Sequence, residues 1–304
     1  NSCFFKNSQG NYFVFHYYHF ILINIIIWFL LINMLIVNIL RKVIYFLFFF
    51  IFYINQLNAL EFKGRFVQGH FILGKTDPNS KVLIDKKEVR VSQDGYFAFG
   101  IGRDRKYDVV ITIEIDGEKQ KIVKKVQKRK YKIQRIDGLE EKKVTPPEEV
   151  YEQIKKENKM ISKARETNSD LDFFKDNLII PVEDATITGV YGSQRILNGK
   201  PKWPHYGLDF AQKEGTPVKA MLNGVVTLAE KDLYYTGGTV IFDHGHGIST
   251  LYMHMKDIYV QIGQKIEQGD IIGTVGSTGR ATGPHLDVRL NWFDIRLDPA
   301  TALN

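Results

Sequence analysis

Hydrophobic and polar residues are distributed unevenly along the 304-residue chain. Residues 7–40 contain no Asp, Glu, Lys or Arg. Arg41 and Lys42 then interrupt the apolar sequence, and residues 43–60 are uncharged again. Each run is long enough to cross a bilayer as a helix, so one interpretation is two membrane-spanning segments.

A second interpretation of the same region starts at Met34, the first methionine of the chain. From there a short basic segment precedes an apolar run over residues 43–54 and a small-residue exit at residues 57–59. This order is typical of a secretory signal peptide. We therefore expect residues 1–33 to be a non-native upstream extension and residues 34–59 to be a signal peptide or, if uncleaved, a membrane anchor. Either outcome predicts a periplasmic or cell-envelope location.

Short apolar runs separated by turn sequences follow from residue 61 to about residue 135. Turn clusters lie at residues 77–80 and 92–95, and Asp116-Gly117 separates two runs rich in β-branched residues. Asp-Gly between two such runs is a strong signal for a β-hairpin. Regular short strands of this kind predict a small β-sandwich module over residues 60–135.

The end of this module is strongly basic. Residues 118–135 contain nine Lys or Arg and one acid. Such a segment can attract a polyanion, for example a wall polymer or lipid headgroups. Lysines also protect exposed edge strands against pairing with other chains, and this alternative is favoured here.

The pattern changes again after Thr145-Pro146-Pro147. Residues 148–166 contain strong helix formers with apolar residues near helical spacing, which predicts a connecting helix within a linker over residues 136–180. Residues 181–304 return to short β-type runs. The predicted fold class is mainly β, with an N-terminal β-sandwich module, a connecting helix and a C-terminal antiparallel β domain.

The overall composition of the chain excludes several classes of protein. The net charge is +7, hydrophobic residues make up 44% of the chain, and Cys3 is the single cysteine. This balance excludes a collagen-like chain and a disordered chain. One cysteine also excludes disulfide stapling and a cysteine-ligated zinc finger.

Candidate chemistry is concentrated in three short motifs of the C-terminal part. His205 and Asp209 are four residues apart in PHYGLD, so on a strand their side chains face the same way and supply half of a zinc site. His254 ends a YMHM strand, and His285 and Asp287 share a face in GPHLD. Each motif alone is a weak signal, but the order of the three strengthens it.

The combination resembles the lysostaphin/LytM-type zinc metallopeptidases, peptidoglycan endopeptidases with a duplicated hybrid motif fold. The resemblance covers residues 187–299 and includes the segments ITGVYGSQRILNGKPKWPHYGLDFAQKEGTPV, TGGTVIFDHGHGISTLYMHM and QIGQKIEQGDIIGTVGSTGRATGPHLD. It implies a lysostaphin-type domain over residues 181–304 that binds Zn²⁺ and cleaves peptide cross-links of peptidoglycan.

The resemblance also implies roles for individual residues. His205 and Asp209 match metal ligands of the family, and His254 and His285 match its catalytic histidines. Asp287 stands where the family usually has a third ligand, a histidine. Carboxylate oxygen is a legitimate zinc ligand, but a second carboxylate would neutralise the metal ion and weaken its action on water and carbonyl groups.

Other polar residues have two interpretations each. Arg195 and Arg289 could hold substrate carboxylates or ligand carboxylates, or could form surface salt bridges. Tyr206 and Tyr252 could line the substrate groove, although packing is the default for aromatic residues. His244 and His246 lie in a glycine-punctuated turn and are expected to be exposed to solvent.

The predicted function is a secreted zinc metalloendopeptidase that remodels peptidoglycan. No nucleic-acid partner is expected, and membrane contact is expected only through the N-terminal segment. One alternative is an inactive LytM-type module that binds the wall or activates amidases, with cell-division proteins as partners. Another makes the β-sandwich a wall-anchoring module and the last domain its scaffold.

Overall fold

The computed structural model describes residues 15–54, 60–138 and 140–303, in two compact units, Asn1–Asn58 and Ala59–Asn304. The predicted small-residue exit at residues 57–59 and the single cysteine, Cys3, lie outside the described residues. Each unit is described separately below. The boundaries predicted for the signal or anchor segment and for the modules remain predictions.

The first unit contains one long helix, α1 (Phe15–Ile54), which continues through Arg41 and Lys42. Its segment Ile21–Phe48 has a mean hydropathy of 2.5, and none of these side chains is buried. By length and composition this segment could cross a bilayer. The described parts of the two apolar runs, residues 15–40 and 43–54, therefore belong to a single helix, which suits a signal sequence and an anchor equally well.

The second unit begins with two small antiparallel sheets that correspond to the predicted strands of residues 60–135. The turns at Asp85-Lys86 and Asp116-Gly117 have positive φ at both residues, as two-residue hairpin turns require. The first sheet has the order β1-β2-β5, with β1 (Glu61–Lys63), β2 (Phe71–Lys75) and β5 (Tyr96–Gly100). The second has the order β4-β3-β6-β7, with β3 (Lys81–Ile84), β4 (Lys87–Val89), β6 (Val109–Ile115) and β7 (Glu118–Lys124).

Strand β7 carries the start of the basic run and lies at the edge of its sheet. Lys119 and Lys121 are exposed, and Lys119 lies 3.5 Å from Glu114 on the neighbouring strand. The prediction of a lysine-protected edge strand is confirmed for β7, because its second edge carries no partner strand among the described residues.

The linker contributes one strand and two helices. Strand β8 (Ile133–Ile136) pairs in parallel with β10 (Gln194–Leu197), far along the chain. The predicted connecting helix is confirmed as α3 (Tyr151–Arg165). Its residues Met160, Ile161 and Ala164 pack on a small apolar cluster of the C-terminal sheet. The remaining helical segments here are α2 (Glu141–Val144) and the 3-10 turns η1 (Glu148–Val150) and η2 (Phe173–Lys175).

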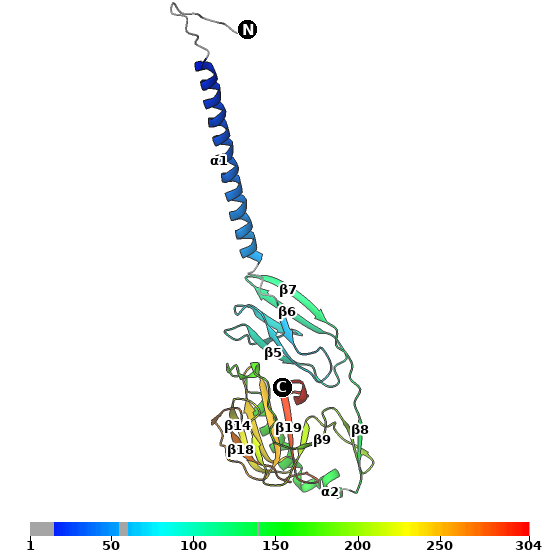
Figure 1. Cartoon of the computed structure of the whole chain (residues 1–304). Helices are drawn as coiled ribbons and strands as arrows, with labels where there is room; N and C mark the ends of the chain where they lie inside the picture. The colour runs from blue at the N-terminus through cyan, green and yellow to red at the C-terminus, as the bar shows by residue number, and fades with distance from the viewer. Residues whose placement is uncertain (1–14, 55–59, 139, 304) are drawn as a thin grey trace, which may run out of the picture. The chain divides into compact units, whose positions relative to one another are not determined.

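The C-terminal part, in which Figure 1 labels β9, β14 and β19, is built on an antiparallel sheet. The order of its strands is β17-β14-β15-β16-β19-β12-β9, and β20 pairs with β19. Its strands are β9 (Thr186–Gly189), β12 (Leu208–Ala211), β14 (Gly224–Leu233), β15 (Gly237–Asp243), β16 (Ile248–Met255), β17 (Lys265–Ile266), β19 (His285–Trp292) and β20 (Ile295–Leu297). Outside this sheet lie β11 (Lys200–Pro201), β13 (Pro217–Lys219), β18 (Ile271–Thr274) and the turn η3 (Pro299–Thr301). The three motif strands, β12, β19 and β16, are therefore adjacent.

One hydrophobic core connects the N-terminal strands with this sheet. Phe99 of β5 packs edge-on against Trp292 of β19 at 6.3 Å between ring centroids. Gly100 approaches Leu297 so closely that a Cβ atom would collide with the leucine side chain. Burial of such large side chains is the main stabilising contribution to folding. The strands of residues 60–135 thus share their core with the C-terminal domain.

Candidate metal centre and catalytic groove

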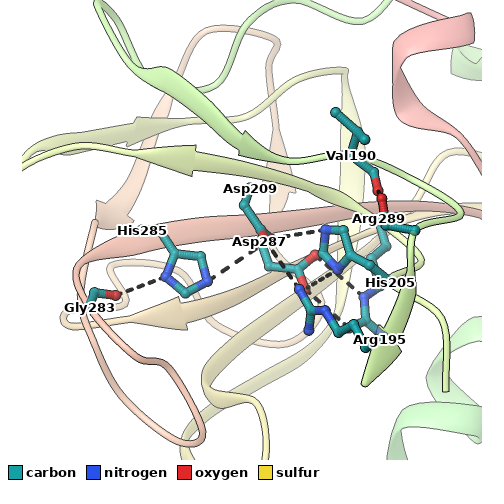
Figure 2. Close-up of polar contacts among 9 residues, drawn as sticks. Val190, Arg195, His205, Asp209, Gly283, His285, Asp287 and Arg289 are labelled. Carbon is teal, nitrogen blue, oxygen red and sulfur yellow. Dashed lines mark hydrogen bonds and ion pairs between the residues drawn. The ribbon is translucent and has the colours of Figure 1, made fainter. Parts of the chain in front are cut away.

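Three buried side chains converge between β12 and β19. Asp209 and Asp287 are directly opposite each other on these antiparallel strands, so their carboxylates point to the same face of the sheet. His205 precedes β12, and its backbone N–H donates to the Ser193 carbonyl at 2.9 Å. Its Nε2 lies 3.1 Å from Asp209 Oδ1 and its Nδ1 lies 3.8 Å from Asp287 Oδ2 (Figure 2).

These side chains have the chemistry of a metal site. One ligand atom from each of His205, Asp209 and Asp287 lies within 4.8 Å of the others, and all three residues are buried. Both ring nitrogens of His205 and Asp209 Oδ1 lack a hydrogen-bond partner among the described residues. Buried polar atoms without partners are costly unless something binds them. One imidazole and two carboxylates fit a zinc ion with an open fourth position.

Each carboxylate is held by an arginine. Arg195 Nη2 donates to Asp209 Oδ2 at 3.3 Å. Arg289 donates from Nη2 to Asp287 Oδ2 at 3.1 Å and from Nε to Oδ1 at 3.4 Å. Burial alone would raise the pKa of Asp287, but the Arg289 guanidinium, together with His205 and His254, outweighs it and holds this pKa well below the usual range of a carboxyl. Asp287 is therefore ionised and oriented as a ligand requires.

This arrangement modifies the expectation that a second carboxylate would leave the metal ion with little effective charge. The guanidinium of Arg289 returns one positive charge beside Asp287, and that of Arg195 does the same beside Asp209. Outer partners of this kind orient metal ligands and tune the metal. Of the interpretations open for these two arginines, the structure supports the holding of ligand carboxylates.

His254 lies at the end of β16, at the rim of the site. Its Nδ1 lies 2.9 Å from the Thr278 carbonyl oxygen, which accepts only a proton-bearing nitrogen. Burial lowers the pKa of His254 to about 4. The ring is therefore neutral near pH 7, with its proton on Nδ1 and the lone pair on Nε2 available to accept a proton.

His285 is the second histidine at this rim. Its Nδ1 lies 2.8 Å from the Gly283 carbonyl oxygen, and its Nε2 lies 4.0 Å from Asp209 Oδ1. The rings of His254 and His285 are 4.8 Å apart between centroids. Two histidines from separate strands thus flank the three candidate ligands, as general acid–base chemistry next to a metal requires.

A groove of about 370 Å³ opens over these residues. Its floor includes Asp209, His254, His285 and Asp287, and one wall is the loop of residues 280–284. The other wall comes from β8, β9 and β10 and contains Gln134, Ile136, Thr188, Arg195 and Leu197. Sequence reasoning predicted no site residue at Gln134 or Ile136, because nothing near them indicates the parallel pairing of β8 with β10.

Gly207 explains why the first motif has a glycine between histidine and aspartate. A Cβ atom here would lie 2.5 Å from the Val288 carbonyl oxygen and closer still to Asp287 Oδ1. Gly189 of β9 leaves similar room for the carboxylate of Asp209. Both glycines thus allow backbone to approach the ligand carboxylates closely.

We expect Gly207→Ala to weaken zinc binding by at least about 10-fold, because its methyl group displaces Asp287 from its position. Affinity is measured by competition with a chromophoric chelator. Gly102→Ala is the matched control, since a Cβ there meets only Ile295 at 3.6 Å. Equal zinc affinity for Gly207→Ala and the wild type would show that Asp287 does not depend on this space.

The two tyrosines expected to line the groove lie elsewhere. Tyr252 is fully buried in the core, and its hydroxyl accepts from the Met221 N–H at 2.8 Å. Tyr206 packs against the Tyr191 ring at 6.2 Å and the Arg296 guanidinium at 5.4 Å. The expectation that Tyr252 contacts substrate is wrong, and Tyr206 is not among the residues that line the groove.

A β-bulge explains why His254 does not follow Tyr252 into the core. Tyr252 pairs with Val288, next to Asp287 on β19, and so lies on the face opposite to that of Asp287. Beyond it, Tyr252 pairs with Val240 and Met255 with Gly238, so two residues of β16 oppose one residue of β15. His254 has a φ of 65° within this bulge. Strict alternation would have placed His254 on the core face with Tyr252, but the bulge turns His254 into the groove.

The expectation that His244 and His246 are exposed is also wrong. His244 is fully buried, with Nδ1 2.6 Å from the Asn223 carbonyl oxygen and Nε2 2.8 Å from Thr250 Oγ1. Burial lowers its pKa to about 4, so it is neutral near pH 7. His246 packs against Phe174 at 4.4 Å between ring centroids. Both histidines support the turn and neither lines the groove.

Comparisons with known proteins agree with this geometry. Residues 203–299 match peptidase family M23. The chain is 45% identical over 87 residues to the peptidoglycan DD-endopeptidase ShyA of Vibrio cholerae, covering 29% of this chain and 20% of that protein. It is 43% identical over 89 residues to the DD-carboxypeptidase/endopeptidase Mpg of Neisseria meningitidis, again covering 29% and 20%. The chain thus spans about a fifth of the length of these curated relatives.

A solved structure extends the likeness beyond the matched domain. The crystal structure of a peptidase M23 protein from Pseudomonas aeruginosa has a TM-score of 0.63 and 26% identity to this chain. The match covers 79% of this chain and 95% of that one, so it includes more than residues 203–299. By sequence and by fold, this chain therefore carries a lysostaphin/LytM-type domain of peptidase family M23.

Proposed function

We propose that the chain is a zinc metalloendopeptidase that hydrolyses peptide cross-links of peptidoglycan in the cell envelope. The observation that carries the proposal is the convergence of His205, Asp209 and Asp287. Both carboxylates line one groove together with the neighbouring His254 and His285. The peptidoglycan substrate is suggested by the names of the relatives ShyA and Mpg. The apolar helix α1 is compatible with an envelope location.

In this proposal His205, Asp209 and Asp287 hold Zn²⁺, which when bound polarises the scissile carbonyl and makes water more acidic. Arg195 orients the carboxylate of Asp209, and Arg289 keeps that of Asp287 ionised and oriented. The groove walls position an extended peptide over the floor and limit the access of bulk water to it.

The two histidines handle the protons. His254 accepts a proton from the attacking water at Nε2, because its Nδ1–H is engaged by the Thr278 carbonyl. Once it carries that proton, His254 can donate it to the leaving amine. His285, held at Nδ1 by the Gly283 carbonyl, presents Nε2 to the same space and, when protonated there, stabilises charge that develops on the carbonyl oxygen. Retention of both histidines favours an enzyme over an inactive amidase activator.

The test uses the full chain in detergent, loaded with zinc and incubated with purified peptidoglycan. We expect chromatography of the muropeptides to show loss of cross-linked dimers and gain of monomers. Removal of zinc with 1,10-phenanthroline is expected to stop the reaction, and added zinc to restore it. If no cross-link is cleaved with zinc or manganese at several pH values, the proposed function is wrong.

A further inference from the structure

Arg280 is a groove residue to which the proposed metal site and acid–base chemistry assign no role. It lies on the loop between β18 and β19, five positions before His285, and lines the groove over the candidate ligands. Its side chain is partly buried. A cation on the wall of a peptide-binding groove raises the question of which group it recognises.

The loop holds Arg280 in a defined position. The Thr278 hydroxyl donates to the Met255 carbonyl at 2.9 Å and accepts from the Gly238 N–H at 2.9 Å. The Arg280 N–H donates to the Tyr235 carbonyl at 3.0 Å, and its guanidinium lies 4.4 Å from the centroid of the Tyr235 ring. Such a stacked guanidinium is preorganised and keeps its N–H groups free for a ligand.

Arg280 differs from the other arginines of the site in having no carboxylate. Arg195 pairs with Asp209 and Arg289 pairs with Asp287. No ion pair joins Arg280 to an acidic side chain in the part of the chain that the structure describes. Burial lowers the pKa of Arg280, and so do the nearby guanidinium groups of Arg195 and Arg289. An anion beside Arg280 would relieve both effects.

The charge of the groove favours the same kind of ligand. Among the residues that line it, the charges of Asp209 and Asp287 balance those of Arg195 and Arg280. A zinc ion would make the groove positive by two charges. A positive, partly enclosed groove attracts anionic ligands and repels cationic ones.

We propose that Arg280 forms a carboxylate subsite, so that the preferred substrate is a peptide with a free carboxylate next to the scissile amide. This inference rests on the proposed function and specifies its substrate class. The planar guanidinium can donate two parallel hydrogen bonds to one carboxylate. Arg280 lines the groove together with Gly283, whose carbonyl holds the His285 ring, so a carboxylate bound to Arg280 occupies the same groove as the scissile amide.

The experiment compares two synthetic cross-linked peptides that differ at one group. In the first, the carbon that bears the scissile nitrogen carries a carboxylate, and in the second a carboxamide. Cleavage efficiency, kcat/KM, is measured for the zinc-loaded full chain and for Arg280→Gln, Arg280→Lys and the exposed control Arg65→Gln. Equilibrium binding of both peptides to each protein is measured by calorimetry.

We expect the wild type and Arg65→Gln to prefer the carboxylate peptide about 10- to 100-fold, as a charge-assisted pair predicts. Arg280→Gln should lose this preference by slowing on the carboxylate peptide alone, and Arg280→Lys should retain part of it. A merely structural role of Arg280 would slow both peptides equally, and this result overturns the proposal.

The results that would contradict the carboxylate subsite differ from those that would contradict the proposed peptidase activity. Equal cleavage of both peptides by the wild type rejects the subsite and leaves the peptidase standing. If neither peptide is cleaved, calorimetry still decides, because the subsite requires tighter binding of the carboxylate peptide by the wild type than by Arg280→Lys. Equal binding of the two peptides rejects it. Should Arg280→Gln fail to fold, Arg280→Lys provides the same comparison.

Discussion

Replacement of Asp287 by alanine is expected to lower the zinc affinity of the chain by more than about 100-fold and to abolish cleavage of peptidoglycan. Loss of an outer partner of a metal ligand typically costs 10- to 100-fold, and the loss of a ligand itself should exceed that. The change also leaves the partly buried guanidinium of Arg289 without its carboxylate, close to the site proposed for the zinc ion. Repulsion between the two adds to the loss of the metal–oxygen bond.

The measurements are bound zinc by mass spectrometry of metals, zinc affinity by chelator competition, and release of muropeptides. Asp294→Ala is the matched control, since Asp294 is exposed and ends the turn between β19 and β20. Thermal unfolding of the metal-free proteins separates a local effect from a folding defect. Full zinc occupancy and activity in Asp287→Ala would show that Asp287 is not a ligand and that another group completes the site.

The three candidate ligands could be predicted from the sequence for two reasons. His205 and Asp209 share one motif, and the resemblance to the lysostaphin/LytM-type peptidases aligns Asp287 with a third ligand. The direct cross-strand register of Asp209 with Asp287, which places both carboxylates on one face, joins residues far apart in the chain and is seen only in the structure. The mainly β fold and the connecting helix α3 could also be predicted, since their patterns are local in the chain.

The rest of the site depends on contacts that no local pattern contains. Gln134 reaches the groove only because β8 pairs in parallel with β10, about sixty residues later in the chain. His254 reaches the groove, while Tyr252 stays in the core, because one extra residue bulges from β16 after Tyr252. His244 is buried because the Asn223 carbonyl and the Thr250 hydroxyl satisfy both of its ring nitrogens, although Gly-punctuated turns usually lie at the surface.

Arg289 was predictable from the sequence in one respect and not in another. Asp287 lies two residues before Arg289, so the spacing suggests that the two side chains form a pair. The spacing does not show how this pair affects the Asp287 carboxylate. Only the observed two-point contact, with distances of 3.1 and 3.4 Å, shows that Arg289 orients the carboxylate of Asp287, the candidate third ligand. The replacement of the usual histidine by aspartate is thus accommodated by a neighbouring cation rather than left as a defect.

His254→Asn is expected to reduce kcat/KM for cross-link cleavage by about 10²- to 10⁴-fold while zinc binding is retained, because general-base catalysis contributes an effect of this size. Asparagine is chosen because His254 has a φ of 65°, a conformation that asparagine tolerates better than alanine does. The amide can still donate to the Thr278 carbonyl, but it offers no nitrogen lone pair to accept a proton.

The matched control for this prediction is His246→Asn. His246 is also a buried histidine with a positive φ, 53°, but it lies outside the groove. Zinc content, thermal unfolding and cleavage are measured for both variants under the same conditions. If His254→Asn loses zinc together with activity, His254 acts as a metal ligand. If it keeps near-normal activity, the proton is accepted elsewhere, and His285, 4.8 Å away between ring centroids, becomes the candidate base.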